Sequence, residues 1–216
     1  MDYLAILKDH LGFIERFYGS ASEPFKSTIH KIDAEEEPFV PERGPGDHDG
    51  PEYLPEWMEA SKCLGVLGNC GLWLLEKALH NYLRAFITRE SSEERAAELS
   101  KGNWFRSYCE FLKTSTPFEW GSCPVTYDQI EQINLSRNDI THDRMIDRTR
   151  PRQSEKHFSK YPTSRFAQAW EVEMLSWGDR MPAFPPTIDI TQENLASAIE
   201  DVRRFCAFVE GQRTKW

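Results

Sequence analysis

Residues 63–87, CLGVLGNCGLWLLEKALHNYLRAFI, decide the fold that we expect for this chain. Apolar side chains occupy almost every side of a helix drawn through this stretch, and such a helix is buried by its neighbours on most sides. Pro55 suits the first turn of the helix, because the N–H group that proline lacks has no partner there. The sequence therefore predicts a central helix from Pro55 to about Arg89, the longest in the chain.

Three glycines, Gly65, Gly68 and Gly71, recur at every third position of this helix. Each costs up to about 1 kcal/mol of helix stability relative to alanine. We expect a compensation in the close approach of another helix, within the protomer or across a dimer. The spacing is not that of a phosphate-binding loop, because the Gly-Lys-Ser/Thr ending is missing. We interpret His80, later in the same helix, as a partly buried histidine with satisfied hydrogen bonds.

Periodic apolar residues and capping signals predict further helices along the chain. Asp2 is the expected N-cap of the first helix, and residues 19–20 are expected to end it. Residues 25–32 fit either a short helix or an extended segment. Ser91 and Glu94 form the pattern of a capping box. The helices predicted besides the central one are 2–18, 91–101, 104–112, 126–145 and a last helix capped by Thr191.

These segments predict an all-α chain, a single domain of residues 1–216, built as an up-and-down bundle of four to five main helices. No segment alternates convincingly between polar and apolar residues, as a strand would. Residues 33–56 form an acidic loop rich in proline and glycine. Residues 147–190 form a long loop and short-helix insertion, with a helix at 164–177. His48, between two aspartates in the acidic loop, lacks the companion ligands of a metal site.

Composition limits the classes of protein to which the chain can belong. The formal net charge is −9, which argues against a surface that coats nucleic acid throughout. The five cysteines are odd in number and widely spaced, which favours reduced thiols in the cytoplasm. No apolar run reaches the roughly 18 residues that span a bilayer, and the start lacks the basic region of a signal peptide. We expect a cytoplasmic protein without membrane contact.

A basic strip interrupts the acidic chain. Residues 137–165 contain eight basic and four acidic side chains. Such a strip fits local phosphate binding, and a solvated arginine-rich loop is nearly as good an explanation. Arg144 and Arg148 within the strip are the residues that we expect to contact RNA if the strip binds phosphate.

The strip begins inside the helix expected at 126–145, where Thr126 and Gln129 form a capping box. Ile130, Ile133, Arg137 and Ile140 follow helical spacing, so an arginine lies on an apolar stripe. Asn138 and His142, four residues apart, stack on a neighbouring face. Arg137 and His142 differ by roughly 140° around the helix and by about 7.5 Å along it. A long arginine and a shorter histidine can therefore approach one groove from two sides.

The pattern Arg137-Asn138-x-x-x-His142, near the end of a helix in an all-helical chain, resembles the signature of the HEPN superfamily. The resemblance covers about half of the chain: the central helix, the motif helix and the last helix. It implies a metal-independent endoribonuclease that attacks the RNA phosphodiester with the adjacent 2′-hydroxyl, with Arg137, Asn138 and His142 as catalytic residues. The tyrosine that one subgroup of toxins carries two places after the histidine is replaced here by Arg144.

The residue types suit this reaction. An imidazole that titrates near neutrality can take a proton from the 2′-hydroxyl or give one to the leaving 5′-oxygen. One histidine cannot easily do both, so two copies of His142 in one cleft of a homodimer are expected to share the task. The fork-shaped Arg137 stabilises the phosphate in the transition state, and Asn138 orients the imidazole or holds the partner helix. No metal or cofactor is implied. An antitoxin or a regulatory protein is a further expected partner, in defence, stress or toxin–antitoxin biology.

A second hypothesis belongs to a different class of protein. In it the chain is a non-catalytic helical module that dimerises or binds a nucleotide or a partner protein. Arg137 is then an interface arginine, Asn138 a polar contact, and His142 a residue that complements the helix dipole near a helix end. Incubation of the protein with RNA in the presence of EDTA discriminates between the two hypotheses.

Overall fold

The computed structural model describes residues 1–41, 52–116, 118–143, 150–176 and 185–213, and these residues form helices and connecting loops. In place of strands, the described part of the chain has two isolated bridges, Arg152 with Thr187 and Ala167 with Ile188. The all-α fold class is therefore confirmed. The helices are α1 (Tyr3–Asp33), α2 (Leu54–Glu90), α3 (Glu93–Leu99), α4 (Trp104–Ser115), α5 (Tyr127–His142), α6 (Glu155–Lys160), α7 (Ala169–Ser176) and α8 (Gln192–Arg213), with a short 3-10 turn at Trp120–Ser122.

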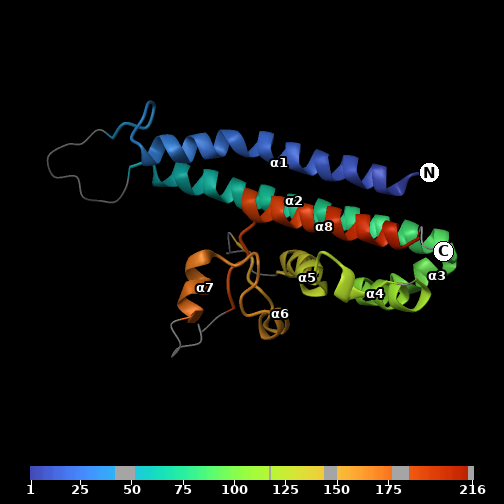
Figure 1. Ribbon diagram of the computed structural model, residues 1–216. Coiled ribbons are helices and arrows are strands. Elements are labelled where there is room, and N and C mark those ends of the chain that lie inside the picture. The colour runs from blue at the N-terminus through green and yellow to red at the C-terminus, as the bar shows by residue number, and fades with distance from the viewer. Residues whose placement is uncertain (42–51, 117, 144–149, 177–184, 214–216) are drawn as a thin grey trace.

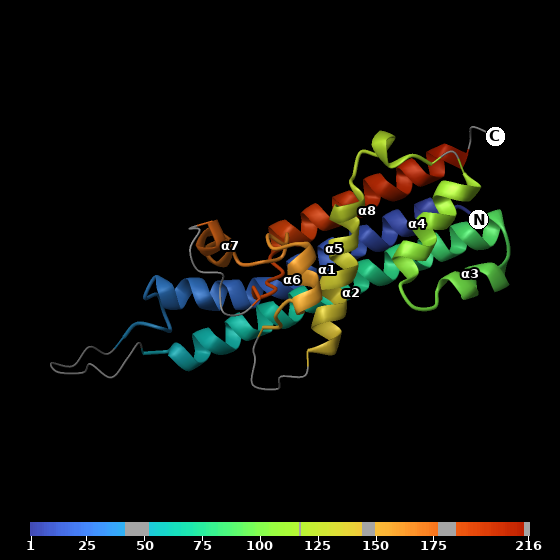
Figure 2. The same cartoon turned by 90° about the horizontal axis from the view of Figure 1, so that it is seen from below.

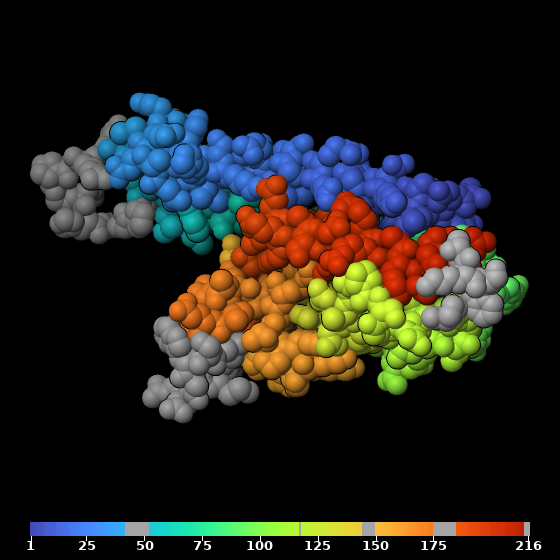
Figure 3. Space-filling model, in the orientation of Figure 1, coloured from blue at the N-terminus to red at the C-terminus, as the bar shows by residue number. Residues whose placement is uncertain are grey.

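Three long helices form the body of the molecule. α1 runs antiparallel to α2, and α8 lies alongside them in the direction of α2 (Figure 1). The α1–α2 hairpin extends beyond the other helices and leaves a notch above α7 (Figure 3). α2 is the longest of the described helices, as predicted, and the described buried apolar residues, with the exception of Ala60, form one cluster around it.

The first helix does not end at residues 19–20, so that prediction was wrong. α1 continues to Asp33 and takes in residues 25–32, even though Pro24 lies inside it. A side chain at Gly19 would meet nothing within 4 Å, and the hydroxyl of the buried Ser22 donates to the Gly19 carbonyl. The cost of one helical glycine, about 1 kcal/mol, is small beside the packing of α1 along α2.

The glycines of α2 partly confirm the expected close approach of a neighbour within the protomer. A Cβ atom at Gly68 would lie 2.4 Å from the carbonyl oxygen of Ile190, and one at Gly71 would lie 2.7 Å from Leu195 Cδ2. Ile190, just before α8, and Leu195, in its first turn, thus pack directly onto the backbone of α2. Gly65 is different, since a Cβ atom there would only reach ordinary contact, 4.0 Å from Arg150 Cγ.

The capping box predicted at Ser91 and Glu94 is also wrong. Ser91 is the C-cap of α2, and its hydroxyl donates to the Ile87 carbonyl at 2.8 Å. Ser92 caps α3 instead, accepting from the Arg95 amide at 3.2 Å. The helix α4 begins at Trp104, as predicted, and its large aromatic side chains are buried in the core.

The insertion after α5 contains more helix than predicted. α6 was missed; Ser154 caps it by accepting from the His157 amide at 3.3 Å. The helix predicted at 164–177 begins later, at Ala169, because residues up to Ala167 turn and bridge to Ile188. The last helix begins as predicted, with Thr191 Oγ1 accepting from the Asn194 amide. None of the helices that the structure describes combines the length and apolar character that a membrane crossing requires.

Candidate functional site

α5 carries the candidate residues and crosses the long helices α1, α2 and α8 at a steep angle (Figure 2). The predicted capping box is present: Thr126 Oγ1 accepts from the Gln129 amide, and the Gln129 side chain accepts from the Thr126 amide. Ile130 and Ile133 are fully buried, as the apolar stripe predicts. The helix ends at His142 and not at Met145, since Asp143 is already extended.

The side of α5 that bears Arg137 opens into a cavity of about 450 Å³. Its walls come from four parts of the chain: α2, the start of α4 with the residues before it, α5 and α6. This volume is in the range of small-molecule and cofactor sites. The lining residues are Glu76, Lys77, His80, Gly102, Asn103, Trp104, Asn134, Leu135, Arg137, Asn138 and Lys156.

In this cavity Arg137 forms an ion pair with the carboxylate of Glu76 and donates a hydrogen bond to the amide oxygen of Asn138. Its Nε atom lies 3.4 Å from Glu76 Oε2, and its Nη1 donates to Asn138 Oδ1 at 3.1 Å. Glu76 is itself fixed, because the indole of Trp104 donates to its other oxygen at 3.1 Å. About a quarter of the Arg137 side chain remains exposed. The guanidinium is therefore oriented and still reachable from the cavity.

Burial raises the pKa of Glu76, while the charge of Arg137 and the hydrogen bond from Trp104 oppose this shift. The pKa of His80, one turn further along α2, is shifted in the opposite direction. Its pKa is lowered to about 4, mainly by burial and further by the positive charges of Lys77, Arg84 and Arg137. The imidazole is thus neutral at pH 7. Its Nε2 lies 3.2 Å from the Tyr108 hydroxyl, and its ring stacks on Tyr108 and packs at a tilt against Trp104, which confirms the interpretation of a satisfied, partly buried histidine.

The cavity has a positive balance of charge. Lys77, Arg137 and Lys156 contribute three cationic groups, and Glu76 is the one acidic residue among the lining side chains. Asn134 adds a buried polar group, whose Oδ1 atom accepts no hydrogen bond within the described part of the chain. A cavity of this size and charge suits an anion such as a phosphate group.

The structure brings two of the three predicted catalytic residues together. Arg137 and Asn138 line the cavity and are hydrogen-bonded to each other, so the amide of Asn138 contacts the arginine. His142 is exposed at the C-terminal end of α5 and is not among the residues that line this cavity. Arg144 and Arg148, predicted to contact RNA, lie outside the described residues, as does His48.

Sequence reasoning missed Glu76, although the sequence carries a signal for it. Glu76 lies four residues after Leu72 and three before Leu79, on the buried stripe of α2, where an acid needs a partner. It also missed the pair of Asp139 and His157, whose carboxylate and Nδ1 lie 2.6 Å apart. The two residues are 18 positions apart in the chain, so no local pattern reveals their contact.

The described residues include no group of three or more histidine, cysteine, aspartate or glutamate side chains placed to hold a metal ion. A comparison of the chain with protein-family models, with curated proteins and with solved structures finds no match. The resemblance to the HEPN superfamily therefore depends on Arg137, Asn138 and His142 and on their helical context.

Proposed function

We propose that this chain is a metal-independent endoribonuclease with a HEPN-like helical bundle, acting as a cytoplasmic homodimer in defence, stress or toxin–antitoxin biology. One observation carries the proposal. Arg137 does not pack into the apolar core; it lies in a polar cavity together with Lys77 and Lys156. A fixed guanidinium beside two further cations is suited to hold a phosphodiester and to stabilise its transition state.

The proposed reaction breaks one bond of the RNA backbone. The 2′-oxygen attacks the adjacent phosphorus, the bond to the 5′-oxygen breaks, and a 2′,3′-cyclic phosphate and a 5′-hydroxyl result. One imidazole takes the proton of the 2′-hydroxyl, and a second gives a proton to the 5′-oxygen. His142 supplies these groups from two protomers, because its exposed position at the end of α5 leaves it accessible to a second copy.

Within this proposal Glu76 and Asn138 are positioning residues. Glu76 pairs with Nε of Arg137, and Asn138 accepts from Nη1. These two contacts leave the remaining N–H groups of the guanidinium for phosphate oxygens. A partner protein that inhibits the enzyme, such as an antitoxin, would act by covering this cavity or the dimer surface.

The decisive experiment is incubation of the purified protein with labelled RNA in EDTA. We expect cleavage to persist without metal and to fall at least about 100-fold in Arg137→Ala and in His142→Ala, in keeping with the loss of an electrostatic or an acid–base group. Lys8→Ala, an exposed change on α1, should cleave like the wild type. Circular dichroism and size-exclusion chromatography of each variant show whether it is folded and dimeric. No cleavage of any RNA by the folded wild type would contradict the proposal.

A non-catalytic helical module is the second candidate, and one observation favours it. Arg137 is already paired with the buried Glu76, and His142 lies outside the cavity that Arg137 lines. In that case the cavity binds a nucleotide or an acidic group of a partner without chemistry. Binding of RNA or nucleotide that is lost in Arg137→Ala, with no cleavage and no effect of His142→Ala, would establish this alternative.

A further inference from the structure

A second face of α5 holds α6 against the bundle. Asp128, Glu131 and Asp139 lie on this face, spaced so that they follow one side of the helix. Tyr161, directly after α6, donates to Asp128 at 2.7 Å and also to Glu131, and Lys160 pairs with Glu131. Each of these three acidic side chains of α5 therefore forms a hydrogen bond or an ion pair with a side chain of α6 or with Tyr161.

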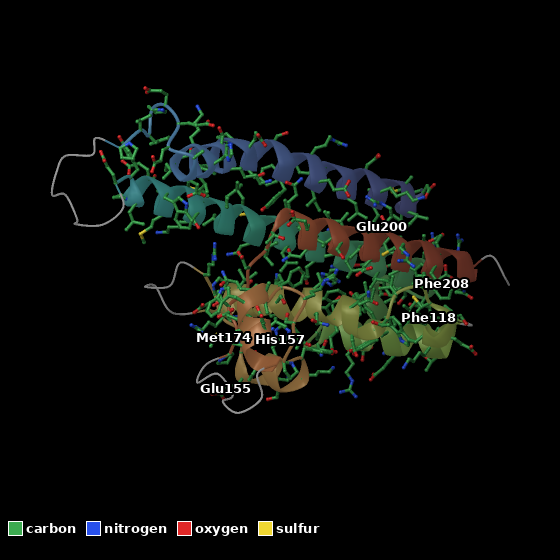
Figure 4. All side chains as sticks on the ribbon, turned by 60° about the vertical axis from the view of Figure 1, so that its left-hand side comes forward. Phe118, Glu155, His157, Met174, Glu200 and Phe208 are labelled. Atoms are coloured by element: carbon green, nitrogen blue, oxygen red, sulfur yellow. The ribbon has the colours of Figure 1, made fainter. Side chains whose placement is uncertain are left out.

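The innermost contact of this face is between Asp139 and His157. The histidine side chain is fully buried and the aspartate side chain is 9% exposed, and the two lie 2.6 Å apart. Figure 4 shows His157 on the side of α6 that faces the bundle and Glu155 on the outer side. A buried hydrogen bond of this kind is costly to break, because a polar atom of each side chain then stays buried without this partner. The pair therefore fixes the rotation of α6.

This rotation determines where Lys156 lies. Lys156 immediately precedes His157, and with α6 held in this way it joins Lys77, Arg137 and Asn138 in lining the cavity. Neither Lys77 nor Lys156 makes an ion pair with any residue in the described ranges, whereas Arg137 is paired with Glu76. The uncompensated charge of the cavity thus comes from the two lysines.

We propose that α6 places Lys156 in the cavity so that it binds, with Lys77, an RNA phosphate next to the phosphate that Arg137 holds. This inference rests on the proposed function, since it takes RNA as the ligand. Phosphate contacts of this kind set the register of the strand and carry no sequence information. Lys156 is accordingly a binding residue for the substrate, and Asp139 and His157 are positioning residues that act through it.

The test measures binding of a fluorescein-labelled, unstructured 20-nucleotide RNA to full-length protein between 50 and 200 mM KCl. His142→Ala is the common background, so that the RNA remains intact. Loss of one phosphate contact reduces the slope of log K against log salt by about 0.7 for a single strand. We expect Lys156→Ala to show this reduction and roughly threefold to tenfold weaker binding at 50 mM salt. Lys156→Arg should retain the slope.

Lys8→Ala provides the matched control. It removes the same charge from an exposed site on α1, which Figure 1 shows on the far side of α2 and α8 from α6. Its salt slope should equal that of the background protein. If Lys156→Ala and Lys8→Ala have the same slope and affinity, the inference is overturned, while RNA cleavage by the wild type would still support the proposed function.

The positioning role is tested by a double-mutant cycle. If His157 acts through Lys156, His157→Ala should weaken RNA binding, and adding Lys156→Ala to it should weaken binding no further. Additive losses would overturn the positioning role. Tyr161→Phe, which removes only the hydroxyl bonded to Asp128 and Glu131, repeats the cycle if His157→Ala does not fold. Failure of the His142→Ala background protein to bind RNA at 50 mM salt would overturn the inference. RNA binding with a salt slope that depends on Lys156, but without cleavage by the wild type, would support the inference and contradict only the proposed catalytic activity.

Discussion

The Nε atom of Arg137 lies 3.4 Å from Oε2 of Glu76, and the side chain of Glu76 is only 4% exposed. A buried carboxylate on the long central helix therefore faces the cation on which the proposed reaction depends. Burial raises the pKa of this carboxyl group, and Arg137 and Trp104 oppose the shift without cancelling it. Three testable consequences involve this pair or its neighbour His80.

The first concerns the pH dependence of stability. A carboxyl group whose pKa is higher in the folded than in the unfolded state contributes stability that is present below its ordinary pKa of 4.5 and is lost as pH rises through the folded value. Glu76→Gln removes this loss. The free energy of unfolding of the variant, relative to wild type, should therefore increase from pH 4.5 to 7.5, by about 1.4 kcal/mol for each unit of the shift.

Urea denaturation at intervals across this range measures the effect. Glu94→Gln, a change at an exposed glutamate of α3, is the control and should differ from wild type by a constant amount. A constant difference for Glu76→Gln as well would show that burial does not raise the pKa of this group.

The second consequence concerns the removal of the cation. Arg137→Ala removes the cation that is paired with the buried Glu76 carboxylate and leaves the hydrogen bond from the Trp104 indole in place. It should lower the free energy of unfolding by about 1–3 kcal/mol at pH 7. The double variant Glu76→Gln/Arg137→Ala should recover part of this loss, because the neutral amide does not need the cation. Chemical denaturation of the four proteins gives the coupling energy. Equal stability losses for Arg137→Ala with and without Glu76 would mean that the two side chains do not interact.

The third consequence concerns His80. The pKa of this histidine is lowered from 6.5 to about 4, so the unfolded chain takes up a proton below about pH 6.5 while the folded protein does not. The contribution of the neutral His80 to the free energy of unfolding is complete above pH 6.5 and is lost as pH falls toward 4. His80→Phe retains an aromatic ring beside Trp104 and should reduce the loss between pH 6.5 and 4.5 by about 2–3 kcal/mol.

Thermal and urea unfolding of His80→Phe and wild type at pH 6.5, 5.5 and 4.5 checks this expectation. His10→Gln, a change at an exposed histidine of α1, is the matched control and should follow wild type. The titration of Glu76 changes the free energy of unfolding in the opposite direction over part of this pH range. The Glu76 and His80 variants are therefore each compared with wild type and not with one another. An unchanged loss on acidification in His80→Phe would contradict the lowered pKa.

Sequence periodicity predicted the fold class and most helix positions, because helix formation depends largely on local spacing. It failed where long-range packing outweighs local cost. Gly19 looks like a helix end, yet α1 passes through it, since the remaining helix packs along α2. Ser91 looks like an N-cap, yet its hydroxyl completes the preceding helix. α6 was missed because six residues carry too little periodicity to be recognised.

In the candidate site, too, the sequence predicted what depends on local spacing and missed what depends on long-range packing. Arg137 and Asn138 stood out as a local motif, and the structure places both in one cavity. The rest of the cavity comes from residues scattered along the chain, from Glu76 on α2 to Lys156 on α6. Only a fold can bring these together, and their relation to Arg137 has no local signature. Glu76 is the exception, since an acid on a buried stripe already indicates a required partner.

The glycines of α2 provide the last prediction, because the structure assigns them different surroundings within one helix. Gly65→Ala adds a methyl group with only ordinary contact at 4.0 Å. It should raise the free energy of unfolding by about 0.5–1 kcal/mol, since alanine restricts the unfolded chain and favours the helix. Gly68→Ala places the same methyl group 2.4 Å from the Ile190 carbonyl oxygen. That oxygen belongs to the backbone of the segment that leads into α8, so this segment must shift, and we expect a loss of about 1–3 kcal/mol.

Gly71→Ala should fall between these two, because the atom that it meets, Leu195 Cδ2 at 2.7 Å, is the end of a flexible side chain. Urea denaturation of the three variants at pH 7 gives the order directly, and each serves as the control for the others because the substitution is identical. The order Gly65, Gly71, Gly68 from most to least stable follows from the packing of α8 on α2. If Gly68→Ala were as stable as Gly65→Ala, Ile190 and the segment that leads into α8 would not contact the backbone of α2 as described.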